Sequence, residues 1–267
     1  MSAEPARAAA LRALLAVTAG HDLERALDRA RRELPAGGDP SFVVELVKGA
    51  LQWQGRYDHL VEVFSRRRAP ADARVRAVLR LSLHQVLGLG GVPAHAALHQ
   101  AGELCRDAAR PAAAGYVNAV LRAVQRAAAG ADEPLAALRA RFPDPARRPV
   151  DHLAAWHSLP RWLVARWHAR LGDAACAALC AQVNRPAPVC LHVLAPHDPA
   201  IAAATLAAAG AAVAPGRWHP RALVLGARVP RPVLRAWLEA QPGLIVQDEG
   251  AQAATRWLAA DLRAPAT

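Results

Sequence analysis

The chain has 267 residues, of which 54% are hydrophobic, so it can fill one large core or two ordinary ones. No apolar run approaches the roughly 20 residues that a membrane span needs, and residues 1–5 lack the apolar core of a secretory signal. Four cysteines in a chain of this length do not suggest a disulfide framework. We therefore expect a cytoplasmic protein without a membrane segment.

The charge balance is strongly basic. The sequence contains 33 basic and 22 acidic residues, a net charge of +11, and Lys48 is its only lysine. Residues 1–150 carry 22 basic and 15 acidic residues, and residues 151–267 carry 11 and 7. An excess of arginine in both halves fits a polyanionic partner, because a guanidinium group can hold a phosphate through two hydrogen bonds and can also stack on bases.

The first half of the chain reads as a series of helices. Apolar residues recur there at spacings of three and four, and the clearest stripe lies in residues 71–87. Asp22 and the pair Asp39-Pro40 are helix-start signals. We interpret the glycine-rich run 88–91 as a helix stop, since a phosphate-binding loop should follow a strand. The predicted helices cover residues 5–19, 22–34, 40–51, the region around 60–64, 71–87, 94–105 and 116–126.

The last two of these helices should pack face to face. Pro93 ends whatever helix precedes it, because its ring clashes with the preceding turn. Asn118 interrupts the apolar stripe of the second helix, and packing alone does not require that residue type. We expect its side chain to bond nearby backbone and pin the two helices together. Direct contact with RNA is the alternative.

Three groups of arginines are candidates for phosphate contacts, on the first helix, in the loop before the 71–87 helix and on the last helix of the bundle. The middle group continues into Arg74, Arg76 and Arg80, and its plain alternative is a solvated loop and helix face. The predicted RNA-binding residues are Arg7, Arg12, Arg66, Arg67, Arg68, Arg122 and Arg126.

The composition of the sequence and its pattern of apolar residues change after residue 130. Residues 131–150 are broken by prolines and read as a linker, with a short helix at 135–142. Beyond them we predict a smaller module of helices and short strands. Its tryptophans at 156, 162 and 167 are expected in helix cores. The predicted strands are 188–194, 211–214, 222–225 and 243–247, and the predicted helices are 173–184, 198–209, 231–240 and 248–260.

The cysteines do not read as chemical groups. Cys105, Cys176 and Cys180 fall within apolar helix faces, and Cys190 falls in a strand, so we interpret them as small hydrophobic residues. A zinc set built on the last three with His192 lacks the usual knuckle spacing with a matching second pair. We therefore predict no metal site and no catalytic residue in this chain.

Two runs of residues resemble the signature of a known family. Val-Pro-Ala-His-Ala-Ala-Leu at 92–98, followed by Gly-Tyr-Val-Asn-Ala-Val-Leu-Arg at 115–122, resembles the signature of the NusB-like RNA-binding domain. That domain occurs alone in transcription antitermination factors and at the front of RsmB/Sun-type rRNA cytosine-C5 methyltransferases. Residues 158–163, 184–186 and 246–252 resemble landmarks that precede the catalytic domain of the latter. The chain departs from that pattern at 191–194, where Leu-His-Val-Leu replaces Leu-Arg-Val-Asn.

The resemblance implies a mainly α protein in three parts: a NusB-like helical bundle at 1–130, a linker at 131–150 and a helical and α+β module at 151–267. It also implies binding to 16S rRNA as part of an enzyme that uses S-adenosylmethionine. The family's Rossmann-like domain, with its Asp-x-Cys-Ala-Ala-Pro-Gly-Gly-Lys loop and Pro-Cys motif, is absent from the 267 residues. We therefore expect this chain to hold no cofactor, to catalyse nothing alone and to be the truncated front of such an enzyme.

Two alternatives stay open at this point. The chain could be a stand-alone antitermination module, although such factors end soon after the helix that contains Asn118. It could also be half of a split enzyme, whose catalytic chain docks on residues 243–260. The sequence does not distinguish a truncated gene model from a true short product.

Overall fold

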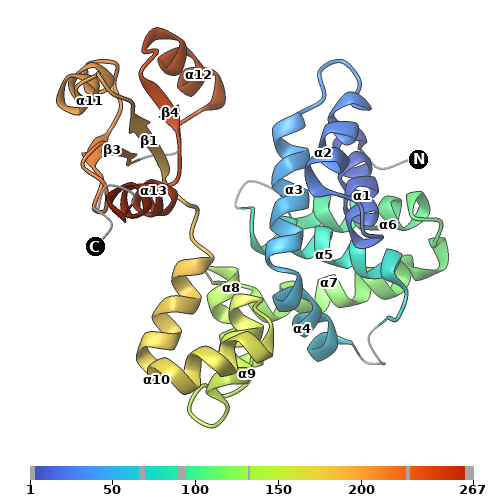
Figure 1. Ribbon diagram of the computed structural model, residues 1–267. Coiled ribbons are helices and arrows are strands. Elements are labelled where there is room, and N and C mark those ends of the chain that lie inside the picture. Colours follow the sequence, from blue (N-terminus) through green and yellow to red (C-terminus); the bar gives the residue numbers. More distant parts are fainter. Residues whose placement is uncertain (1–3, 66–69, 90–93, 132, 227–228, 262–267) are drawn as a thin grey trace. The chain divides into compact units, whose positions relative to one another are not determined.

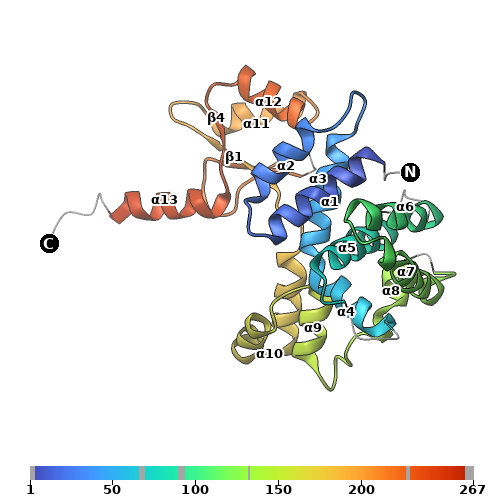
Figure 2. The same cartoon turned by 90° about the vertical axis from the view of Figure 1, so that its right-hand side faces the viewer.

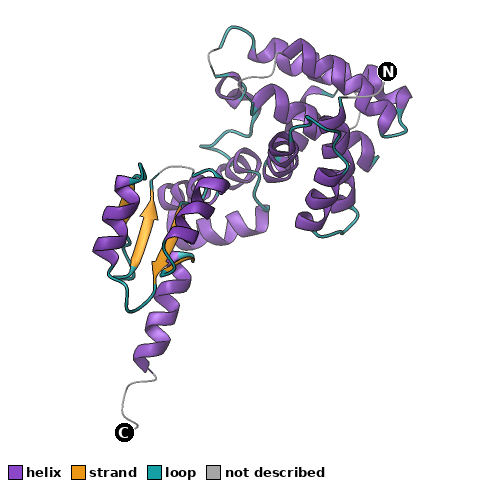
Figure 3. Cartoon of the chain, turned by 90° about the horizontal axis from the view of Figure 1, so that it is seen from above, coloured by secondary structure: helices purple, strands orange, loops and turns teal. Residues whose placement is uncertain are grey.

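The structure is a computed structural model that describes residues 4–65, 70–89, 94–131, 133–226 and 229–261. The chain divides into two compact units, Met1–Asn184 and Arg185–Thr267. The strands belong to the second unit, as the colouring of Figure 3 makes plain. No described helix is long and apolar enough to cross a membrane.

The first unit begins with a bundle of helices (Figure 1). The predicted start signals act as caps, because the carboxylate of Asp22 accepts a hydrogen bond from the backbone N–H of Arg25 and that of Asp39 accepts from Ser41. The bundle consists of α1 (Pro5–Thr18), α2 (Leu23–Arg32), α3 (Pro40–Gln52), α4 (Gln54–Phe64), α5 (Ala73–Leu87), α6 (Ala94–Asp107) and α7 (Ala114–Ala128), with a short 3-10 turn, η1 (Pro111–Ala113), before α7.

Helix α5 lies at the centre of this bundle and contacts α1, α3, α4, α6 and α7. Its side chains Val78, Leu79 and Leu83 are fully buried, which confirms the stripe predicted over residues 71–87. The mainly α fold class is likewise confirmed. The predicted break at Pro93 lies outside the described residues.

The proline-broken segment is held against the bundle. It contains α8 (Pro134–Ala137) and the 3-10 turn η2 (Arg139–Arg141), where a single short helix was expected. Leu138 and Phe142 are buried in the same core as the bundle helices. The segment predicted as a linker is therefore anchored, and the division into compact units falls after Asn184. The three-part division predicted from the sequence stays a prediction.

Two further helices, α9 (Pro149–His157) and α10 (Arg161–Val183), complete the first unit. Helix α10 is broken at Gly172, whose φ of 75° and ψ of 178° are not helical. Trp156 packs against the bundle core and Trp167 against a small core between α9 and α10. Trp162, by contrast, is 67% exposed, so the prediction that it is a core residue was wrong.

Arg56 joins α9 to the bundle. It lies on α4 and is only 6% exposed. Its Nε donates a hydrogen bond of 2.6 Å to the carbonyl oxygen of Trp156, and its guanidinium lies 3.8 Å from the ring centroid of Trp53 and 5.0 Å from that of Trp156. The backbone N–H of Gly55 adds a 2.8 Å bond to the hydroxyl of Ser158, which ends α9. Cation–π contacts and backbone hydrogen bonds thus fix α9 on α4.

The second unit is the predicted α+β module. Its antiparallel sheet has the order β2-β3-β1-β4, and Leu191 of β1 is paired with Leu223 of β3 and Val246 of β4. Helices α11 and α12 share a core with one face of this sheet, built around Leu191 and Leu206. The elements are β1 (Val189–Val193), α11 (Pro199–Ala208), β2 (Val213–Pro215), β3 (Ala222–Leu225), α12 (Arg231–Ala240), β4 (Leu244–Val246) and α13 (Glu249–Asp261).

Helix α13 touches the sheet only near its start. Gln252 is buried against β1, where its side chain bonds His192 and the carbonyl oxygen of Leu191, and the helix then projects outward (Figure 2). Trp257 and Leu258 on the projecting part are 71% and 55% exposed. Apolar surface is therefore exposed at these two positions and at Val246 of the edge strand, whereas Leu244 is buried.

Candidate nucleic-acid interface

Arg7 is used inside the bundle. Its side chain is 14% exposed, its Nε donates to the side-chain oxygen of Gln85 at 2.6 Å, and its Nη1 donates to Glu4 at 2.7 Å. The guanidinium also lies 5.1 Å from the ring centroid of Phe42. Arg7 therefore joins α1 to α3 and α5, and little of its surface is left for a phosphate.

Arg12 lies at the surface, but its charge is paired. Its Nε donates to Glu33 at 3.1 Å, and the other oxygen of Glu33 accepts from Arg29 at 2.9 Å. These two arginines, Arg29 more than Arg12, lower the pKa of the Glu33 carboxyl group. A phosphate at Arg12 would have to compete with this exposed ion pair, which contributes little stability of its own.

Arg122 and Arg126 are the predicted residues best placed for RNA. Both are exposed on α7, one helical turn apart, on the side opposite its buried residues Val117, Leu121 and Val124. Within the described part of the chain, neither guanidinium takes part in an ion pair or hydrogen bond. Two unpaired arginines one turn apart on a helix, with Cβ atoms about 6 Å apart, can bind neighbouring phosphates.

Asn118 lies on the inner side of the same helix. Its Nδ2 is 3.9 Å from the position that a β-carbon on Gly102 of α6 would take. Its Oδ1 is buried and has no hydrogen-bond partner among the described residues. The structure thus places Asn118 at the α6–α7 packing face, as expected, without showing the predicted bonds to backbone.

The arginine run that begins at Arg66 is described only in part, since Arg66, Arg67 and Arg68 lie outside the described residues. Ser65, directly before them, shares a 2.6 Å hydrogen bond between its hydroxyl and that of Tyr116. Tyr116 is in the first turn of α7. Ser65 is therefore fixed on the helix that carries Arg122 and Arg126.

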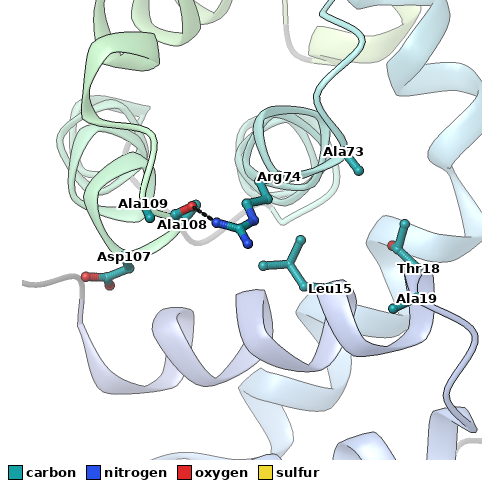
Figure 4. Close-up of a pocket in the computed structure, with 8 residues that line it drawn as sticks. All are labelled: Leu15, Thr18, Ala19, Ala73, Arg74, Asp107, Ala108 and Ala109. Carbon is teal, nitrogen blue, oxygen red and sulfur yellow. Dashed lines mark hydrogen bonds between the residues drawn. The ribbon is translucent and has the colours of Figure 1, made fainter.

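The downstream members of that run are spread over different surroundings. Arg80 is bound by both carboxylate oxygens of Asp58, at 2.8 and 2.5 Å, and Arg76 is exposed. Arg74 lines a cavity of about 510 Å³ between α1, α5 and the end of α6, where its Nη1 donates to the carbonyl oxygen of Ala108 (Figure 4). The run is therefore not one continuous basic face.

The four cysteines are buried and none forms a disulfide. Burial raises the pKa of the Cys105 thiol to about 11 and that of Cys180 to about 12. These two thiols are protonated at neutral pH, whereas nucleophilic attack needs a thiolate. The described residues contain no group of three or more side chains placed to hold a metal ion.

Two family models match parts of the chain, and the second match begins within the first compact unit. Residues 4–126 match the NusB family, and residues 159–231 match the Methyltr_RsmF/B-like, ferredoxin-like domain. The chain is a NusB domain followed by an RsmF/B-type ferredoxin-like domain. This is the domain order expected from the resemblance to the front of RsmB/Sun-type proteins, and the resemblance is thereby confirmed.

Several relatives carry methyltransferase names. The chain is 33% identical to "Probable ribosomal RNA small subunit methyltransferase B" of Bacillus subtilis over 52% of its own length and 29% of the relative's. It is 31% identical to "Ribosomal RNA small subunit methyltransferase B" of Pseudomonas putida over 96% of its own length and 54% of that protein's. The chain thus spans about half the length, or less, of these relatives.

Two other comparisons bear on single domains and on the fold. The chain is 31% identical to "Transcription antitermination protein NusB" of Nitratidesulfovibrio vulgaris, over 38% of this chain and 62% of that one. The crystal structure of PH0851 aligns with 92% of this chain and 54% of its own, at a TM-score of 0.52 and 16% identity. At that identity the likeness concerns the fold alone.

Proposed function

We propose that this chain binds small-subunit rRNA in the cytoplasm for an S-adenosylmethionine-dependent cytosine-C5 methyltransferase of the RsmB/Sun type. The observation that carries the proposal is the pair of exposed, unpaired arginines on α7, Arg122 and Arg126, in a chain whose relatives include proteins named as ribosomal RNA methyltransferases. The match over 96% of the chain to a methyltransferase favours this reading over a stand-alone antitermination factor.

In this proposal the methyl transfer itself is done by a domain outside these 267 residues. Addition to C6 of cytosine needs a thiolate, and the Cys105 and Cys180 thiols described above are buried and protonated. We therefore expect calorimetry to show no saturable binding of S-adenosylmethionine to this chain. Val246, Trp257 and Leu258, all exposed, are the surface on which a catalytic domain would dock.

The experiment that tests RNA binding reverses the charges on α7. The double variant Arg122→Glu and Arg126→Glu should weaken binding of a 16S rRNA fragment at least tenfold in a filter-binding assay, since two phosphate contacts become repulsive. It should also flatten the dependence of affinity on salt.

The matched control is Arg25→Glu with Arg29→Glu on α2. These two residues are also exposed, one turn apart on one helix, and give the same change in net charge. An equal loss of affinity in both double variants would mean that only overall charge matters, and would remove α7 as the RNA-binding surface.

A further inference from the structure

The connection between β2 and β3 in the second unit presents a tryptophan to solvent. Trp218 lies in residues 216–221 and keeps 56% of its surface exposed. A large aromatic ring is normally buried in a small domain, because its transfer out of water is strongly favourable. None of the predicted RNA-binding residues lies in this unit, so the exposed ring calls for its own explanation.

The backbone that carries Trp218 is held on both sides. The N–H of Trp218 donates to Glu249 at 2.5 Å, and its carbonyl oxygen accepts from Nη1 of Arg256 at 3.3 Å. Gly216 bonds Ala222 of β3 through its N–H at 2.8 Å, and a β-carbon at Gly216 would come within 2.3 Å of the Ala222 side chain. The connection therefore packs tightly on β3 and α13, and it presents the ring from a fixed position.

One arginine lies against the Trp218 ring and another contacts its backbone. The guanidinium of Arg217 lies 4.6 Å from the ring centroid of Trp218, within the range of a cation–π contact. Arg217 and Arg256 are both exposed, and within the described residues neither is paired with a carboxylate. Arg221, the third arginine here, is turned inward, where its Nε donates to the carbonyl oxygen of Val193 at 2.6 Å.

The acidic residues nearby, Glu249 and Asp248, form no ion pair with Arg217 or Arg256 among the described residues. One oxygen of Glu249 accepts a hydrogen bond from the N–H of Trp218, and Asp248 caps α13 by accepting from the N–H of Gly250 at 2.8 Å. His219 packs against His192 with ring centroids 4.9 Å apart. Burial, together with the charges of His192, Arg256 and Arg221, lowers the pKa of His219, so this ring adds a neutral aromatic neighbour at pH 7.

We propose that Arg217, Trp218 and Arg256, which we call the Trp218 platform, bind an unpaired nucleotide of single-stranded RNA. A base stacks on the Trp218 ring, and the two guanidinium groups contact the phosphates beside it. A fixed, exposed aromatic ring beside cations is the arrangement that stacks bases without reading their sequence. The inference rests on the proposed function, since it gives the second unit its own contact with the same RNA.

The test uses the whole chain and an unstructured, fluorescein-labelled oligouridylate, with binding followed by fluorescence anisotropy. Trp218→Ala should weaken binding about tenfold, in keeping with the loss of one stacked base, and Trp218→Phe should stay within about threefold of the unchanged chain. Arg217→Gln should reduce the salt dependence. Because residue 218 is exposed, the thermal midpoint should not move in these variants.

Trp162→Ala is the matched control. It removes another exposed tryptophan, one that lies on α10 of the first unit. Unchanged oligouridylate binding in Trp218→Ala, or an equal loss in Trp162→Ala, would overturn the platform. If the α7 charge reversal still weakened binding of the 16S fragment, the proposed function would stand without it. If the unaltered chain bound neither RNA, both would fail.

Discussion

At the scale of single residues, the stability of the first unit depends on a buried arginine. Arg56 is charged at neutral pH even though burial lowers its pKa to about 10, and no described carboxylate is paired with it. Its charge is compensated by the carbonyl oxygen and ring of Trp156 and by the ring of Trp53. Removing the Arg56 side chain would therefore remove its hydrogen bond and both cation–π contacts together.

We predict that Arg56→Ala lowers the free energy of unfolding by about 3 kcal/mol, because it deletes desolvated cation–π contacts and leaves a buried carbonyl oxygen unsatisfied. Arg56→Lys should lower the free energy of unfolding by a substantial part of that amount, since an ammonium group lacks the planar guanidinium. Urea denaturation followed by tryptophan fluorescence measures the change. Exposed Arg25→Ala is the control, and an Arg56→Ala midpoint equal to that of the control would show that the junction is unimportant.

His157, beside the same junction, makes stability depend on pH. Burial, and after it the positive charges of Arg56, His152 and Arg139, lowers its pKa from 6.5 to about 4. Below pH 6.5 the unfolded chain therefore takes up a proton that the folded chain refuses. The stabilising difference is complete above about pH 6.5 and is lost as the pH falls toward 4. We predict that His157→Gln flattens the fall in thermal midpoint over this window. A parallel pH profile for the variant and the unaltered chain would refute it.

The sequence predicts the exposure of some candidate RNA-binding arginines but not of others. The spacing of Arg122 and Arg126 relative to the apolar stripe of α7 is enough to place them outside. From the sequence alone Arg7 is equally expected to face solvent. In the structure, however, its side chain donates a hydrogen bond to Gln85, which is 78 residues away. The partners of an arginine come from tertiary packing, so composition and helical spacing could not separate Arg7 from the other two. Trp218 was missed for the same reason, since only the fold brings Arg256 to it.

At the scale of elements, most helices were predictable to within a few residues because each buries one apolar stripe. Helix α4, expected around 60–64, begins earlier, at Gln54, whereas the helix expected at 173–184 matches the part of α10 that follows its break at Gly172. A single glycine inside an otherwise helical pattern does not reveal its backbone angles. Its φ of 75° with ψ of 178° belongs to a region that residues with a β-carbon avoid.

Gly172→Ala should therefore destabilise the first unit by about 2 kcal/mol, although no atom lies within 4 Å of the new methyl group. Gly115→Ala provides the opposite case. Gly115 is in the first turn of α7, its added methyl group also meets nothing within 4 Å, and helical backbone suits alanine. That variant should gain about 0.5 kcal/mol. Thermal denaturation of both variants tests the break, and a shift of the same sign in both would mean that α10 is not broken there.

At the scale of the whole molecule, the structure changes which segment we expect a protease to cut first. Residues 130–150 look like a linker in sequence, but Leu138 and Phe142 are buried in the bundle core. Residues 185–188 lie between the compact units, are exposed and have no regular secondary structure. The buried positions of the earlier segment could not be inferred from its prolines, because proline content does not reveal which side chains reach a core.

Brief digestion with a protease of broad specificity should therefore cut first within residues 185–188 and release a helical fragment that retains α9 and α10. Mass spectrometry of the fragments identifies the cut. First cleavage within 130–150, with α9 and α10 lost from the helical fragment, would contradict the anchoring of that segment by Leu138 and Phe142.

We propose above that the chain binds ribosomal RNA through arginines that contact phosphate. The most direct measurement is the affinity of the whole 267-residue chain for a 16S rRNA fragment over a series of salt concentrations. We predict tight binding at low salt and a linear fall in the logarithm of the affinity as the logarithm of the salt concentration rises, with a slope that drops by about two in the Arg122→Glu and Arg126→Glu double variant. Affinity that does not change with salt concentration, or no binding at low salt, would contradict RNA binding through these arginines.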